Sequence, residues 1–163
     1  MYLKTILLFL LITLTGAKVP KEFSARVIGV VDGDTVKILY ENKPIQIRLE
    51  HIDCPEKGQA YSTKAKQFVS NSIFGKTVKV VNNGKWHWNR LIAEIYYDKN
   101  QNINKSLVKN GLAMHFIKYS KSKEYSELEQ KARINKVGVW SLSKVIAPWE
   151  YRKAKKNKTF IEK

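Results

Sequence analysis

The chain has 163 residues, of which 30 are lysine or arginine and 14 are aspartate or glutamate, so its formal net charge is +16 at neutral pH. This length suits one domain with one hydrophobic core. The positive charge favours polyanionic partners, either nucleic acid or an anionic membrane surface, and a simple solubility effect is the alternative. Cys54 is the only cysteine, which excludes an internal disulfide bond.

The first 17 residues have the pattern of a secretory signal peptide. Lys4 supplies a positive charge, an apolar run occupies residues 6–14, and small residues end the segment at Ala17. The run is shorter than the roughly 20 residues that span a bilayer, although retention as an N-terminal anchor is the alternative. We therefore expect a secreted or periplasmic protein, with no transmembrane segment after this leader.

Three strands are expected next, over residues 26–31, 35–40 and 45–52, each rich in β-branched or alternating apolar residues. Asp32, Gly33 and Asp34 separate the first two strands. An Asp-Gly pair between such runs is typical of a hairpin whose tight turn needs positive φ. A turn over residues 41–44 separates the second strand from the third, so the three strands form a meander.

Apolar spacing in the rest of the chain predicts a helix over 59–73, strands over 76–81 and 91–97, and a helix over 102–110. A third helix is expected over 123–136, which is acidic early and basic late, as the helix dipole favours. The resulting order, βββαββαα, predicts an α+β fold that is mainly β, a five-stranded OB-fold barrel with three α-helices. This domain is expected to occupy residues 18–151. Residues 152–163 form a basic tail, which either extends a nucleic-acid track or is a solvated end of the chain.

Charged residues near the strand ends predict a phosphate-binding site. Arg48 and Arg90 present planar guanidinium groups that suit phosphate oxygens. Asp34 and Asp53 offer the hard oxygen ligands that Ca²⁺ prefers. Glu56 follows Asp53 closely and can accept a proton from a water beside the metal. These are the components that phosphodiester cleavage requires.

Each of these residues also has a purely structural interpretation. Asp32 and Asp34 can belong to a simple turn, and Arg48 can pair with Glu50 or Asp53 in a surface salt bridge. The three histidines have no metal-ligand spacing and are expected to be structural or surface residues; they are His51, His87 and His115. From the residues alone, the prediction stops at a phosphate-handling site.

Five separated motifs resemble the staphylococcal nuclease (thermonuclease) family. They are residues 31–36, Arg48-Leu49 with 52–56, 89–91, 107–113, and 138–140 with 148–152. The resemblance implies an OB barrel with three helices that cleaves DNA and RNA, favours unpaired regions and leaves 3′-phosphate ends. It implies no stable protein partner and a monomer.

The resemblance also implies roles for individual residues. Arg48, Glu56 and Arg90 match the family's catalytic positions. Calcium would be held by Asp34, Asp53 and the backbone carbonyl of Cys54, with Asp32 nearby. Cys54 replaces a threonine of the name-giving member, and only its carbonyl is expected to matter.

The segment before the second arginine departs from the family pattern. Trp86-His87-Trp88-Asn89 stands where the family has Asp-x-Tyr-Gly. Trp88 is expected to stack on a base or cover the pocket, and Asn89 to accept the positive φ of the replaced glycine. Tyr119 is expected to contact the nucleotide, whereas Ile117 replaces a second tyrosine. The alternative function is a catalytically silent OB-fold protein that binds nucleic acid, although binding alone needs no Glu56.

Overall fold

The computed structural model describes residues 19–161. The expected signal peptide lies outside the described residues. No helix in the described part of the chain combines the length and hydropathy of a membrane-spanning segment.

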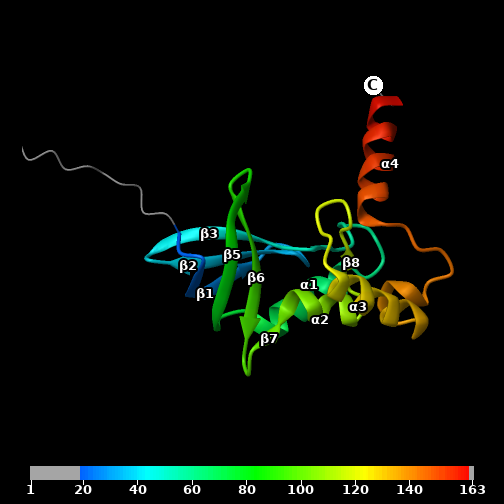
Figure 1. The fold of residues 1–163 in the computed structure, drawn as a ribbon. Helices are drawn as coiled ribbons and strands as arrows, with labels where there is room; N and C mark the ends of the chain where they lie inside the picture. The colour runs from blue at the N-terminus through cyan, green and yellow to red at the C-terminus, as the bar shows by residue number, and fades with distance from the viewer. Residues whose placement is uncertain (1–18, 162–163) are drawn as a thin grey trace, which may run out of the picture.

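Five strands close into a barrel, and Figure 1 shows β5 and β6 crossing in front of β1, β2 and β3. They are β1 (Glu22–Val30), β2 (Thr35–Tyr40), β3 (Lys43–Leu49), β5 (Thr77–His87) and β6 (Arg90–Tyr97). The sheet order β3-β2-β1-β5-β6 is antiparallel throughout, and a parallel pairing of β3 with β6 closes it. Closure removes the free edges that an open sheet would expose.

Alternation of apolar and polar residues fixes which face of each strand enters the barrel. Ile47 and Leu49 of β3 are buried, as are Leu91 and Ala93 of β6, while the residues between them lie on the outer face. The buried side chains form one continuous core that includes residues of α1 and α2. Arg48 is therefore placed on the outside of the barrel wall.

Most of the helices and short strands lie at one end of the barrel (Figure 1). The helices are α1 (Ser62–Ile73), α2 (Ile103–Lys109), α3 (Lys123–Ile134), a short 3₁₀ helix (Gly138–Ser141) and α4 (Pro148–Ile161). The short strands are β4 (Ile52–Asp53), β7 (Gln101–Asn102) and β8 (Met114–His115). β4 pairs with β8, which ties the segment after β3 to the loop before α3.

The expected α+β fold with an OB-type barrel is confirmed, but the expected number of helices was too low. The structure adds α4, which projects away from the barrel (Figure 1). Pro148 occupies its first position, and the Glu150 carboxylate accepts from the Ala147 amide at 3.4 Å. Both features favour a helix start. The expected boundary between domain and tail, at Tyr151, falls inside this helix.

The first hairpin also differs from the expectation. Gly33 does not have a positive φ. Its lack of a side chain is required by packing, since a Cβ there would lie 2.9 Å from both Cys54 Sγ and the Cβ of Ala65. The glycine thus lets the β1–β2 loop approach the segment after β4.

Candidate active site

The loop between β1 and β2 and the end of β3 meet at one edge of the barrel. The Leu49 amide donates to the Asp34 carbonyl at 2.8 Å, and Arg48 pairs in register with Thr35. β4 follows after a short turn and carries Asp53, of which only 1% is exposed. The two expected acidic ligands and the first expected catalytic arginine therefore converge.

Arg48 holds these two aspartates together. Its Nη2 atom lies 2.8 Å from Asp53 Oδ1 and 3.2 Å from Asp34 Oδ2. Its Nη1 atom donates to the carbonyls of Leu49 and Ile52, each at 2.8 Å. Both terminal nitrogens of this guanidinium thus have two acceptors each. Of the two structural alternatives for Arg48, pairing with Asp53 is present, and the pair is largely buried rather than a surface salt bridge.

The acidic side chain of Asp34 is strongly perturbed by its surroundings. Burial raises the pKa of Asp34 to about 7, although the Arg48 guanidinium favours the charged form. The Cys54 amide donates to Asp34 Oδ2 at 2.8 Å, which fixes the carboxylate orientation. Burial also raises the pKa of the Cys54 thiol, and the negative charge of Asp34 adds to the shift. The thiol is therefore protonated and a poor nucleophile.

Glu56 lies just beyond this cluster, in the loop between β4 and α1. Its amide donates to the Gln59 side chain at 2.8 Å, and Gln59 Nε2 donates to the Ile146 carbonyl at 3.1 Å. The Glu56 side chain is 37% exposed, which leaves it accessible to water. An acceptor for a proton is thus held beside the buried aspartates.

Arg152 of α4 joins Glu56 to Asp53. Its Nη2 donates to Asp53 Oδ2 at 2.7 Å, and its Nη1 lies 3.2 Å from Asp53 Oδ1 and 2.5 Å from Glu56 Oε1. This fork is the bidentate arrangement that guanidinium and carboxylate groups favour. Arg152 ends the last motif of the family resemblance, but it was expected in the tail and without a catalytic role. Pro148 and Glu150, which predict a helix start before it, are the signals that could have brought it into the domain.

Arg90 lies apart from the carboxylates. It begins β6 and pairs in register with Gln46 of β3, while Arg48 pairs with Ile92. Both arginines are on the outer face, one diagonal step apart on neighbouring strands. Among the described contacts, Arg90 has only the His87 ring, with Nη2 3.3 Å from Nδ1. Its guanidinium is therefore available to a ligand.

The two expected substrate-binding residues lie on separate loops. Trp88 is at the tip of the β5–β6 hairpin, with 85% of its surface exposed and a φ of 56°. The sequence predicts a positive φ at Asn89, but in the structure Trp88 has it instead. Tyr119 follows β8 and is 71% exposed, with its ring 4.8 Å from that of Phe116. No described contact joins either residue to Arg48 or Glu56.

Donor chemistry decides whether these residues suit a calcium ion. Among residues 19–161, no group of three or more His, Cys, Asp or Glu side chains is arranged as metal ligands. Asp34 and Asp53 nevertheless contact one guanidinium nitrogen, so their oxygens are close together. The raised pKa of Asp34 reflects buried negative charge that a cation would offset. Hard carboxylate and carbonyl oxygens fit Ca²⁺, whereas the thiol does not.

Comparison with known proteins identifies the family to which this geometry belongs. The model of the family described as staphylococcal nuclease homologue matches residues 46–142. The chain belongs to the staphylococcal nuclease family. A Haemophilus influenzae protein named "Uncharacterized endonuclease" is 35% identical over 150 residues, covering 91% of this chain and 84% of that protein. The Shigella flexneri "Micrococcal nuclease" is 32% identical over 148 residues, or 85% of each chain.

A plant relative is similar only to part of its own length. The Arabidopsis thaliana "Staphylococcal-like nuclease CAN1" is 33% identical over 114 residues, which are 70% of this chain and 35% of that protein. The matched family region begins at Gln46 and includes Arg48, Asp53, Glu56 and Arg90, but Asp34 and Arg152 lie outside it. The contacts of Arg152 therefore come from the structure and not from the family match.

Proposed function

We propose that this protein is a calcium-dependent nuclease that hydrolyses phosphodiester bonds of DNA and RNA and leaves 3′-phosphate ends. The observation that carries the proposal is the compact cluster in which Arg48 and Arg152 connect two buried aspartates to the accessible carboxylate of Glu56. Family membership and the names of the relatives support the nuclease activity. The products and the metal are inferred from the donor set and the resemblance.

Each side chain then has a defined task. Asp34, Asp53 and the Cys54 carbonyl would hold calcium, which would supply positive charge to the phosphate and to a nearby water. Glu56 accepts the proton of the attacking water at its carboxylate. Arg90, with its available guanidinium, donates to the phosphate oxygens as negative charge develops. Arg48 orients the aspartates, because its terminal nitrogens are already occupied by protein acceptors.

The decisive test is cleavage with and without calcium. Purified protein should degrade single-stranded DNA and plasmid DNA in millimolar Ca²⁺, since a site with two acidic ligands resembles weak extracellular calcium modules of roughly 10⁻⁴–10⁻³ M. An excess of chelator should stop the reaction, and Glu56→Gln should bind DNA without cutting it. Full cleavage in chelator would contradict the role of Asp34 and Asp53. Binding without cleavage at any calcium concentration would instead support the catalytically silent OB-fold protein.

We also propose that the protein acts outside the cytoplasm and, as the family resemblance implies, as a monomer. The basis for export is the signal-peptide pattern of residues 1–17. N-terminal sequencing of protein from the medium and the periplasm should find a chain that starts after Ala17. A protein recovered only with its leader, in the membrane fraction, would support the retained anchor.

A further inference from the structure

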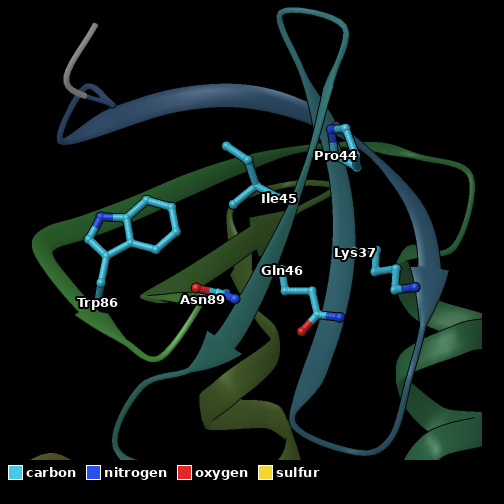
Figure 2. Close-up of a pocket in the computed structure, with 6 residues that line it drawn as sticks. All are labelled: Lys37, Pro44, Ile45, Gln46, Trp86 and Asn89. Carbon is cyan, nitrogen blue, oxygen red and sulfur yellow. The ribbon is translucent and has the colours of Figure 1, made fainter. Parts of the chain in front are cut away.

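A hollow of about 410 Å³ lies between the β2–β3 hairpin and the β5–β6 hairpin. Figure 2 shows Trp86 and Asn89 on one side of it and residues of β2 and β3 on the other. Its lining residues are Lys37, Pro44, Ile45, Gln46, Trp86 and Asn89. The volume lies in the range of small-ligand sites, about 300–1,000 Å³, and none of the lining residues is acidic.

The hollow adjoins the candidate active site through Arg90. Asn89 directly precedes Arg90 in the chain, and Gln46 pairs with Arg90 in register. Gln46 is also two residues before Arg48, on the same outward face of β3. A strand whose phosphate contacts Arg90 would therefore place a neighbouring nucleotide beside the hollow.

The lining has the chemistry of a nucleobase subsite. Trp86 is 49% exposed and presents an indole ring, while Ile45 offers an apolar surface across the hollow (Figure 2). A flat base can stack between two such walls, and stacking tolerates any base. The amides of Gln46 and Asn89 can donate to and accept from a base edge. Lys37 is exposed and positively charged, which suits a flanking phosphate.

We propose that this hollow binds one unpaired nucleobase of the strand that is cut, next to the scissile phosphate. The proposal rests on the proposed nuclease function and adds a substrate subsite to it. Trp86 is its stacking residue. Trp88 lies at the hairpin tip and does not line it.

The test combines Trp86→Ala with removal of single bases. In a Glu56→Gln background, which prevents cleavage, affinity is measured by fluorescence anisotropy for short single-stranded DNAs in which one base at a time is abasic. Stacking of one base contributes a factor of about 5 to 150 in affinity. Trp86→Ala should therefore weaken binding by about that factor, and Trp86→Phe should retain most of it. Phe74→Ala is the matched control, because Phe74 is 57% exposed beyond the end of α1.

The position of the effect identifies the subsite. Binding should weaken when the base is removed at one position beside the bond that wild-type protein cleaves. In the Trp86→Ala variant, removal of the same base should leave the affinity unchanged, which is the coupling that a double-mutant cycle measures. The subsite proposal is wrong if wild-type protein cleaves DNA but adding Trp86→Ala to Glu56→Gln leaves the affinity for every abasic substrate unchanged. If the coupling is present but wild-type protein never cleaves, the subsite stands and the proposed function fails. Thermal unfolding and Trp86→Phe binding separate a folding defect from loss of stacking.

Discussion

The two arginines of the candidate site differ in how much protein structure depends on them. Arg48 has four polar contacts with protein acceptors, and its side chain is only 14% exposed. Arg90 has a single described polar contact, with a histidine ring. A buried guanidinium with this many partners stabilises the fold, whereas one with few partners is free to serve a ligand.

Lysine substitutions should separate these roles. Arg48→Lys keeps the charge but cannot reproduce four contacts, so we expect it to lower the free energy of unfolding by about 2–3 kcal/mol and to lower kcat. Arg90→Lys should leave stability within about 0.5 kcal/mol and reduce kcat by roughly 10²–10³, as loss of one preorganised donor does. Denaturant unfolding and steady-state kinetics measure both quantities. Equal stability of the two variants would contradict this division of roles.

For the candidate site, the sequence predicts which residues belong to it better than it predicts the contacts between them. Asp34, Arg48 and Asp53 were expected at one site, and the structure brings them together because Leu49 pairs with the β1–β2 loop. The sequence predicts that the Arg48 guanidinium binds phosphate, but it does not show which protein acceptors already surround that group. Which acceptors surround a guanidinium depends on carbonyls of the turn after β3, and turn geometry leaves no periodic signal.

Helix α4 couples the C-terminal segment to the site through two contacts on one face. The ring of Trp149 stacks on Phe116 at 5.3 Å and 4°. Arg152 follows three residues later, on the same side of the helix, and contacts Asp53 and Glu56. The aromatic stack thus sets the position of the guanidinium, and α4 belongs to the site even though it projects from the barrel.

Arg152→Ala should therefore impair catalysis more than binding. Glu56 would lose its described side-chain partner, and Asp53 would keep only Arg48, so both carboxylates would be less well oriented. We expect kcat to fall by about 10- to 100-fold, since misplacing catalytic groups by an ångström has effects of that order. Arg152→Lys should recover part of the loss, and the control Lys66→Ala, an exposed lysine on α1, should lower kcat by nothing measurable. A rise in kcat with tighter calcium binding would instead identify Arg152 as a competitor of the metal.

Element prediction from the sequence succeeded where apolar periodicity was strong. The barrel strands and α1 follow alternating or helical spacing, which a buried face requires. The helix α3 was predicted from its charges instead, because acidic residues come early in it and basic residues late. The fourth helix has few apolar residues after Tyr151, so periodicity gave no indication of it. Gly33 was assigned to a tight turn because Asp-Gly usually forms one, whereas its role depends on Cys54 and Ala65, which are distant in sequence.

Across the whole molecule, one buried histidine links stability to pH. His115 lies 2.8 Å from Ser120 Oγ and 3.1 Å from Ser126 Oγ. Burial lowers the pKa of His115 below 6.5, opposed by Glu129 and reinforced by His51. The unfolded chain therefore takes up the proton at higher pH than the folded protein does.

This histidine should make the fold less stable in mild acid. The neutral His115 side chain contributes fully to stability above about pH 6.5, the pKa of an unfolded histidine. The free energy of unfolding should decline as the pH falls below that value. His115→Gln cannot take up the proton, so its melting temperature should fall less than that of wild type between pH 7.5 and 5.5. Thermal unfolding at both pH values gives the comparison. Identical declines in the two proteins would show that other groups govern the acid response.

The positive charges of the chain, which sum to a net +16, attract nucleic acid where they lie on the surface. The helix α4 projects away from the barrel (Figure 1). Its exposed residues include Lys153 and Lys156. We expect these lysines to contact the phosphate backbone of a strand held at the site, because Arg152 on the same helix already contacts Glu56. The basic segment would then extend the nucleic-acid track.

Salt dependence tests this extension quantitatively. The logarithm of the binding constant falls linearly with the logarithm of salt concentration, by about 0.7 per phosphate contact for single strands. Replacing Lys153 and Lys156 by glutamine should therefore make the slope shallower by up to about 1.4. The control replaces Lys66 and Lys99, which are exposed on α1 and after β6, and so changes the net charge equally. If both pairs alter the slope alike, only the overall charge matters; if the α4 pair alters nothing, the helix lies outside the path of the strand.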